Sequence, residues 1–457
     1  MNPGSAVRLS LSILFGCCSL LAAQRARADI PVTQLGFANG DDWEPAIAVD
    51  GQFVYVSFPH YGAATVPDSS GATCQTNQTS SYEYFQRSTD GGATWSALTI
   101  PRCPVSGSQV DAQVVVGPNH RVYVSYMDGP QANSNIELIW SDDHGVTWSS
   151  PINAAGGGGG DKDLLLVDPS GGVTIAYEHL SSAYVAYSPN PATTAFTRNK
   201  INPPAGAGNG TSLATGGVRD SHGNAYYAWT DVTNNAKGDS FLWLSKSNDG
   251  FQTYTTSLID RSFAANVKTG AGWDYWGASV QIAAIAKPTT DRLVVVYNAG
   301  TSDGAAERIY TKYSDTNGST WNIPYSATSY PNGTQLSAAP AGAWHGFMAI
   351  AGTASGVKTM WQDNRVQFPC TSSTVAGQCG LWNNYARTST DGVTWTAEQK
   401  MQLLTTHTYQ VSTPAPGGFF HPYGDYAWLA TDGTTTWAVW GEGNSYPGPG
   451  TIYAAHF

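Results

Sequence analysis

A strand-like segment recurs seven times along the chain, and this repeat limits the fold more than any other feature. In each copy an alternating stretch ends in an aromatic residue, as in 53–58 (Phe-Val-Tyr-Val-Ser-Phe). The other copies are 121–126, 172–177, 224–229, 292–297, 356–361 and 435–440. Turn signals such as Asp50-Gly51 precede the copies, and small apolar strands such as 46–49 precede the turns. Seven similar sheets that each need neighbours to bury their faces indicate a radial repeat architecture.

The composition agrees with an all-β fold. Charged residues make up only 12% of the chain and aromatic residues 12%, with 50 glycines. Few helix formers and many β-formers favour short strands joined by tight turns. We therefore predict a β-propeller of seven four-stranded blades, with six blades as the alternative. The last unit holds only three strands, so the N-terminal segment near 32–37 is expected to supply the fourth and close the ring.

A second motif, Ser-x-Asp-x-Gly-x-x-Trp, follows the third strand of most units. It is complete at 88–95 and 141–148, one residue short at 389–395, and degenerate at 247–254 and 314–321. The third unit lacks it around 188–196, although its strand repeat persists. The aspartate can accept backbone N–H bonds within its own turn, and glycine allows a positive φ. We expect a folding role for the motif, with its tryptophan packed between adjacent sheets.

These motifs resemble the Asp box of the sialidase-like, BNR-repeat β-propeller superfamily over essentially the whole mature length. The resemblance implies a propeller whose Asp boxes lie on the face away from the active site. The box occurs in sialidases, in other glycosidases and in receptors without activity, so it indicates the fold and not the reaction.

The N-terminus is typical of an export signal. Arg8 precedes an apolar run over 9–23, and the small residues Ala26 and Ala28 precede an expected cleavage before Asp29. Residues 1–28 are therefore predicted to be a signal peptide and 29–457 a single propeller domain, secreted to the periplasm or the medium. Lipidation at Cys17 is not favoured, because Phe15 fits a lipoprotein box poorly. The sequence holds no further apolar stretch that could cross a membrane.

Four cysteines follow the signal. Local pairing predicts two disulfides, Cys74–Cys103 and Cys370–Cys379. The net charge of −11 argues against nucleic acid as a partner. A monomer is expected, with no required cofactor, although calcium held by loop carboxylates is left open.

The blade register places one set of loops on the face opposite the Asp boxes, and that face collects carboxylates. They are Asp42, Glu44, Asp111, Asp161, Asp163, Asp274 and Asp425 before first strands, and Asp128, Glu178, Asp231, Asp363 and Glu442 after second strands. Paired carboxylates can act as acid and base, or as acid and nucleophile, in glycoside hydrolysis. The alternative for each is a solvated or strand-end acid.

Aromatic clusters precede the fifth, sixth and seventh units, and flat rings beside polar groups suit sugars. From these patterns we predict catalytic roles for Asp363, Asp425, Tyr426 and His345. The predicted substrate-binding residues are Arg365, His421, Tyr423, Trp273, Asp274, Trp276, Asp42 and Glu44. The alternative for Asp363 and Arg365 is that they pair and brace their own loop.

The expected function is a carbohydrate-active protein, a glycosidase-like hydrolase acting on a glycan or polysaccharide, with lyase chemistry left open. The arginine triad and the Arg-Ile-Pro segment of sialidases cannot be assigned, which argues against cleavage of sialic acid. A non-catalytic propeller that binds glycan or protein is the alternative.

Overall fold

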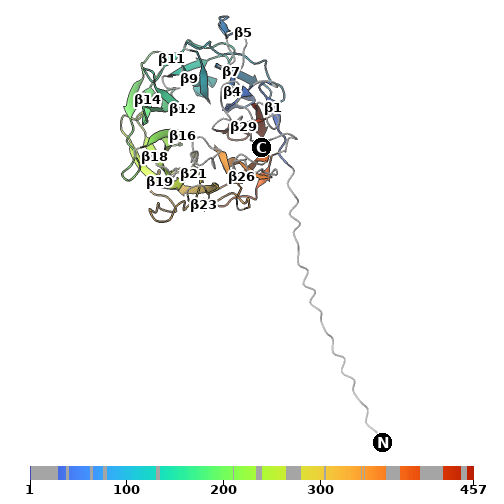
Figure 1. The fold of residues 1–457 in the computed structure, drawn as a ribbon, viewed down its shortest axis with the longest axis vertical. Coiled ribbons are helices and arrows are strands. Elements are labelled where there is room, and N and C mark those ends of the chain that lie inside the picture. Colours follow the sequence, from blue (N-terminus) through green and yellow to red (C-terminus); the bar gives the residue numbers. More distant parts are fainter. Residues whose placement is uncertain are drawn as a thin grey trace, which may run out of the picture.

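The structure, a computed structural model, describes Met1 and most of the chain after residue 28. The described ranges are 29–37, 41–61, 65–75, 80–105, 107–129, 134–208, 210–232, 239–263, 279–302, 305–340, 342–343, 345–366, 381–401, 426–443 and 450–457. Within them the chain forms strands, and the one helical element is the 3-10 turn η1 (Pro118–His120). Figure 1 shows the sheets arranged in a ring, with the first strand, β1 (Thr33–Leu35), beside the C-terminal end of the chain.

Seven antiparallel four-stranded sheets form the blades, as predicted. The first blade contains β2 (Asp41–Asp42), β3 (Ala46–Asp50), β4 (Phe53–Tyr61) and β7 (Ser81–Ser88). The second contains β8 (Gln109–Val116), β9 (Val122–Asp128), β10 (Asn135–Ser141) and β11 (Ile152–Asn153). The third contains β12 (Gly160–Val167), β13 (Val173–His179), β14 (Ser182–Ser188) and β15 (Thr197–Lys200). The fourth contains β16 (Thr211–Arg219), β17 (Ala225–Val232), β18 (Asp239–Ser247) and β19 (Thr255–Phe263).

The remaining blades follow in chain order. The fifth contains β20 (Val280–Ile285), β21 (Arg292–Ala299), β22 (Arg308–Ser314) and β23 (Thr334–Gln335). The sixth contains β24 (His345–Thr353), β25 (Gly356–Val366), β26 (Leu381–Ser389) and β27 (Gln399–Lys400). The seventh contains β28 (Trp428–Thr431), β29 (Thr436–Gly443), β30 (Gly450–His456) and β1 (Thr33–Leu35).

The N-terminal strand closes the ring. β1 pairs antiparallel with β30, with Thr33 opposite Ala454 and Leu35 opposite Ile452. Residues from both ends of the chain therefore share one sheet, and the outer edge of the seventh blade is paired rather than open. This confirms the predicted closure and the seven-blade count.

Apolar side chains fill the spaces between neighbouring blades. Seven buried clusters are present, one for each pair of adjacent sheets around the ring. The aromatic residue that ends each repeat supplies much of this core: Trp229, Trp361 and Trp440 are each at most 1% exposed. Aromatic side chains bury a large area each, so the repeat is explained by packing between sheets.

The serine–aspartate turns have the hydrogen bonds expected from their sequence. At the first turn, Ser88 Oγ donates to Asp90 Oδ1 at 2.7 Å and accepts from the Gly92 amide at 2.8 Å, while the Thr94 amide donates to Asp90 at 2.9 Å. Similar bonds recur in the turns that begin at Ser141, Ser247 and Ser389. Trp95 packs edge-on against Trp437 of the seventh blade, so the turn also fixes its neighbour.

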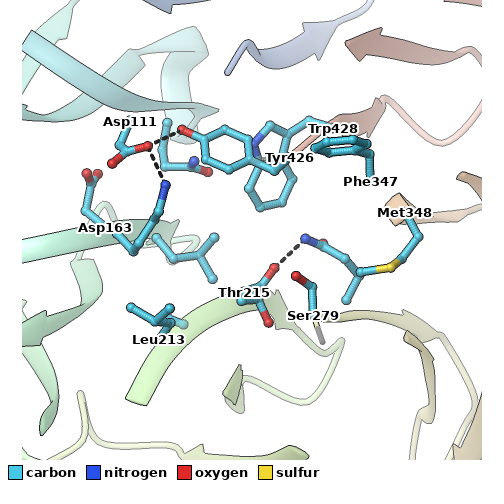
Figure 2. A pocket seen from close by; sticks show the side chains of 14 residues that line it. Asp111, Asp163, Leu213, Thr215, Ser279, Phe347, Met348, Tyr426 and Trp428 are labelled. Atoms are coloured by element: carbon cyan, nitrogen blue, oxygen red, sulfur yellow. Dashed lines mark hydrogen bonds and ion pairs between the residues drawn. The ribbon is translucent and has the colours of Figure 1, made fainter. Parts of the chain in front are cut away.

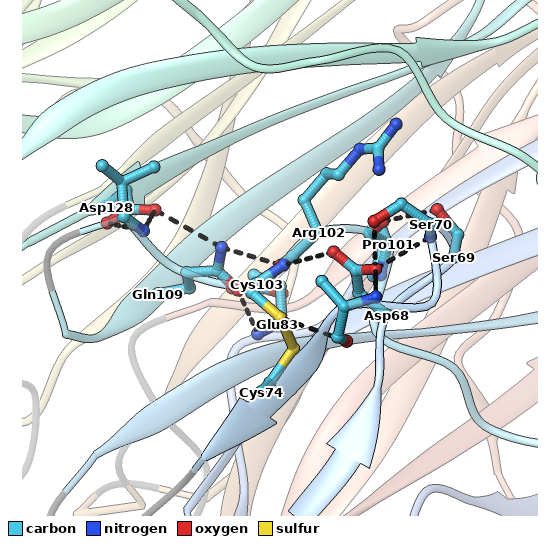
Figure 3. Close-up of a disulfide and its surroundings, with 12 residues drawn as sticks. Asp68, Ser69, Ser70, Cys74, Glu83, Pro101, Arg102, Cys103, Gln109 and Asp128 are labelled. Carbon is cyan, nitrogen blue, oxygen red and sulfur yellow. Dashed lines mark hydrogen bonds between the residues drawn. A yellow bond between two sulfur atoms is a disulfide. The ribbon is translucent and has the colours of Figure 1, made fainter.

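A disulfide joins Cys74 to Cys103, as predicted, with the two Cα atoms 5.3 Å apart. It ties the hairpin of β5 (Thr65–Pro67) and β6 (Thr73–Gln75), which lies at the rim of the ring, to the segment before the second blade (Figures 1 and 3). Asp68 accepts the amide hydrogen of Cys103 at 3.1 Å in the same corner. Cys370 and Cys379 lie outside the described residues, so their pairing stays a prediction.

Candidate active site at the propeller axis

An extra residue interrupts the pairing of the first two strands in several blades, near the axis. In the second, third and sixth blades the register shifts by one residue at 110–113, 161–164 and 346–349. Such bulges re-aim side chains and are common next to active sites. The residue across each bulge is Tyr126, Tyr177 or Trp361, the aromatic that ends the repeat. In these three blades the aromatic residue of the repeat therefore lies opposite the bulge of the first strand.

The bulges hold non-glycine residues at positive φ. Asp111, Lys162 and Phe347 have φ of 61°, 51° and 48°, and Glu44 at the start of the first blade has 44°. A left-handed conformation costs a non-glycine residue on the order of 1 kcal/mol or more, and such strain clusters at functional sites. Four strained residues around one axis mark this end of the propeller as a candidate site.

Asp111, Lys162 and Glu44 form a charged cluster with Tyr426, which precedes the first strand of the seventh blade. Lys162 Nζ lies 2.9 Å from Asp111 Oδ1 and 3.7 Å from Glu44 Oε1. Tyr426 donates its phenol hydrogen to the same Asp111 oxygen at 3.0 Å, and the Lys162 ammonium lies 5.1 Å from the centre of the Tyr426 ring. Asp111 thus accepts two donors that come from different blades (Figure 2).

Two further buried acids, Asp163 and Glu83, interact electrostatically with this cluster. Burial raises the pKa of Asp163 and the pKa of Glu83 well above their ordinary values. The negative charge of nearby Asp111 raises both pKa values further. The hydrogen bond from Ser125 to Asp163 and the hydrogen bond from Ser57 to Glu83 oppose these shifts. Ser125 donates to Asp163 Oδ2 and Ser57 donates to Glu83 Oε2 at 3.1 Å. The second oxygens, Asp163 Oδ1 and Glu83 Oε1, are buried and have no hydrogen-bond partner. Burial therefore favours the protonated form of both acids.

The phenol of Tyr426 is also held protonated. Burial raises its pKa well above the ordinary value, and the negative charges of Asp111 and Glu44 add to the shift. At neutral pH Tyr426 can therefore donate a hydrogen bond or a proton, but it is a poor base unless a neighbour removes its proton.

The cluster lines a small pocket of about 40 Å³. Asp111, Lys162, Asp163 and Tyr426 form one side, and Phe347, Met348 and Trp428 form an apolar side (Figure 2). Trp428 also lines a second cavity of about 300 Å³, which is bounded mainly by aliphatic residues from the first strands of all seven blades. Trp428, Gln113 and Leu164 thus line both the pocket with the polar groups and this apolar cavity.

The arginines that the structure describes lie outside the lining of the axial pocket. The ten arginines after residue 28 lie within the described ranges, and none of them lines the axial pocket. Arg121, Arg292 and Arg365 pair with carboxylates, whereas Arg87, Arg198 and Arg308 donate to backbone carbonyl groups. A three-arginine grip on a sugar carboxylate is thus absent from the axis among these residues.

Of the residues predicted from the sequence, Tyr426 lines the axial pocket and Glu44 contacts its lysine. Asp42 lies elsewhere and is fully buried: it accepts from the Phe37 amide at 2.7 Å, bonds His60 at 2.6 Å and contacts Thr451. Burial raises the pKa of Asp42, and the bond to His60 opposes that shift. These contacts join both ends of the chain to the first blade, so Asp42 braces the ring closure.

Asp363, Arg365 and His345 come together inside the sixth blade and do not line the axial pocket. The Arg365 guanidinium grips Asp363 at 2.6 and 2.8 Å, reaches Glu398 at 2.7 Å and lies 3.6 Å from the Tyr385 ring centre. His345 is buried and contacts two backbone carbonyl oxygens through Nδ1; burial lowers its pKa to about 3, and Arg308 and Arg365 contribute. This geometry corresponds to the bracing alternative.

The other predicted site residues lie outside the described residues: Asp425, His421, Tyr423, Trp273, Asp274 and Trp276. The blade register predicts Asp111 and Asp163 on this face, but no motif marks them as a pair. The sequence patterns do not mark Lys162 as a site residue, nor do they mark Glu83, which lies on β7 of the first blade. The available signal was position: Asp111 and Lys162 directly precede apolar first strands in equivalent places of consecutive units.

Within the described ranges, one group of potential metal ligands is close enough to share an ion, namely Asp68 with Cys74 and Cys103. Because those two sulfur atoms form the disulfide, this group is not a convincing metal site. The same part of the chain contains no helix of the length and hydropathy that crossing a bilayer requires.

No family model and no curated protein matches the sequence. Solved structures do match. An ulvan lyase of polysaccharide lyase family PL25 aligns with a TM-score of 0.50 at 8% identity, covering 92% of this chain and 95% of the lyase. A protein of unknown function from Dyadobacter fermentans gives 0.48 at 12% identity, covering 94% and 98%. The Hadza microbial sialidase Hz136 gives 0.44 at 14% identity, covering 91% of this chain but 65% of its own. The chain thus shares its propeller fold with a polysaccharide lyase, and sialidases are among its structural neighbours.

Proposed function

We propose that the protein is a secreted carbohydrate-active propeller of the Asp-box kind, a glycosidase-like hydrolase whose reactive groups are Asp111, Asp163, Lys162 and Tyr426 at the axis. Within this proposal, residues 1–28 are the signal peptide and 29–457 are a single monomeric domain. The disulfide supports an oxidising compartment. The ulvan lyase supports a glycan as the class of ligand, because it shares the fold and acts on a polysaccharide.

The pairing of Asp111 with Asp163 carries the proposal. Both line one pocket, but their surroundings differ: Asp111 accepts bonds from an ammonium and a phenol, whereas burial raises the pKa of Asp163. Glycoside hydrolysis uses one carboxyl group as the proton donor and one carboxylate as base or nucleophile. Asp163 would protonate the leaving oxygen, and Asp111, on the same side of the pocket, would act as base or nucleophile, either directly or through the phenol of Tyr426.

The second candidate is a non-catalytic glycan-binding propeller. The pocket of about 40 Å³ favours it, because that space holds a few water molecules or one substituent of a sugar rather than a whole ring. In this case the same residues would hold the substituent without breaking a bond.

A screen of a broad neutral and acidic oligosaccharide panel tests the proposal, with products detected by mass spectrometry and binding by calorimetry. Asp111→Asn and Asp163→Asn should each abolish products. Asp142→Asn, an exposed aspartate paired with Arg121, is the matched control and should leave them unchanged. Binding without products would establish the second candidate, and neither binding nor products would refute both.

A further inference from the structure

We infer that the axial pocket takes an uncharged sugar through a hydroxyl or hydroxymethyl group, and that it rejects sugars that present a carboxylate. This inference rests on the proposed function and names its class of substrate. Three independent observations carry it: the charge balance of the pocket, the location of the arginines and a buried oxygen that lacks a donor.

The charge balance of the pocket is the first observation. Among the described residues, four acids, Glu44, Glu83, Asp111 and Asp163, lie at or beside the pocket with one cation, Lys162, whose ammonium contacts Asp111 and Glu44. Even with the two deeper acids protonated, the two upper carboxylates outnumber the ammonium. An anionic group that entered this pocket would lose water and meet a like charge, which opposes binding strongly in a buried site.

The arginines are the second observation. A sugar carboxylate is usually held by bidentate guanidinium groups, since their forked donors match its two oxygens. All ten arginines of the chain after residue 28 are described, and each lies away from the lining of the pocket. Uronic and sialic acids would therefore find neither an excess of positive charge nor a guanidinium fork in this pocket. The same argument opposes β-elimination, in which a site must neutralise a carboxylate beside the proton that is removed.

The third observation points to what the pocket accepts. Asp163 lines the pocket and is 3% exposed, and its Oδ1 has no hydrogen-bond partner although Oδ2 is satisfied by Ser125. A buried polar atom without a partner is costly and indicates a missing donor. A sugar hydroxyl supplies such a donor, and it can also accept if Asp163 carries its proton on Oδ1. The apolar side, formed by Phe347, Met348 and Trp428, suits the C–H surface of the same sugar.

Size alone would not separate the two kinds of sugar. A hydroxymethyl group and a carboxylate at C6 of a hexose have nearly the same volume, and either would fit a pocket of about 40 Å³. Discrimination must then come from charge, so it can be measured with sugars that differ only at C6.

The test uses matched pairs: oligosaccharides of glucose, galactose and mannose, and the same chains oxidised at C6 to uronic acids, with sialyllactose as a further acid. Binding is measured by calorimetry and cleavage by mass spectrometry at pH 7. We expect at least one neutral member to be preferred over its acid by tenfold or more. Lys162→Met should widen that ratio and Asp111→Asn should narrow it, whereas Asp142→Asn should leave it unchanged.

A uronic acid or sialyllactose that binds as well as or better than the neutral chains would overturn the inference. The proposed function would survive that result if Asp111→Asn still abolished cleavage. If no member of either series bound or reacted, the inference and the proposed function would both fail. If Lys162→Met does not fold, the ratio measured with Asp111→Asn decides alone.

Discussion

Lys162 of the third blade and Asp111 of the second hold each other at 2.9 Å from equivalent positions, each at positive φ and each within the bulge of its first strand. The bulge turns the side chain toward the axis, and the neighbouring blade supplies the opposite charge. The pairing of charges at this site therefore depends on how the blades are placed around the ring and not on any continuous motif.

Replacing Lys162 with methionine should lower the free energy of unfolding by about 3 kcal/mol at pH 7, because Asp111 and Glu44 are left as buried carboxylates without their cation. Urea unfolding at pH 7 measures this. Lys287→Met, which breaks the exposed pair with Asp315, is the control and should change stability little.

Arg365→Lys should destabilise the protein by about 2–4 kcal/mol without changing its affinity for a glycan, since lysine cannot reproduce the fork between Asp363 and Glu398. The control is Arg121→Lys, which removes a similar fork to exposed Asp142. Its expected cost is below about 1 kcal/mol. A loss of glycan affinity at unchanged stability would instead assign Arg365 to a ligand site.

Glu137 should make stability depend on pH. Burial raises its pKa to about 7, and nearby Asp128 adds to the shift. The folded state therefore keeps a proton that the unfolded state releases near pH 4.5, so Glu137 costs stability progressively as the pH rises from about 4.5 to 7. Glu137→Gln should match the wild type at pH 4 and exceed it by on the order of 2 kcal/mol above pH 7. Parallel curves at all pH values would show that Glu137 is ionised in the fold.

Reducing the Cys74–Cys103 link should destabilise the β5–β6 corner. The bond closes a loop with a sequence separation of 29 residues, for which chain entropy predicts about 3.6 kcal/mol. The Cys74→Ser/Cys103→Ser double variant should therefore unfold at lower urea concentration than the wild type. Peptide mapping without reductant should find this link and the predicted Cys370–Cys379 link. A Cys74–Cys370 crosslink would contradict local pairing.

Much of the fold could be predicted because the strands and turns are determined by residue patterns that span only a few positions of the sequence. The repeat that ends at Phe58 and at six later aromatic residues marks the second strand of each blade. Because the last unit has only three strands, the N-terminal segment is predicted to supply the fourth, and Thr33 does pair with Ala454. The serine–aspartate turns are equally local, because Ser88 and Asp90 make their bonds within a few residues.

The candidate site was harder to predict, because it is made of contacts between blades. The acidic face and Tyr426 follow from the blade register, but the register alone does not reveal that Lys162 reaches Asp111 or that Asp163 is left with a bare oxygen. Arg365 shows the converse. The sequence predicts a loop position that would suit a ligand, whereas Arg365 lies in β25, where Asp363 and Glu398 occupy its guanidinium fork.

The most direct test of the account is a crystal structure of the Asp111→Asn variant soaked with a neutral oligosaccharide that the wild-type protein binds or cleaves. The account predicts a sugar hydroxyl at about 3 Å from Asp163 Oδ1, with the sugar's C–H surface on Trp428. An oligosaccharide bound at another face, with the axial pocket holding only water, would contradict it.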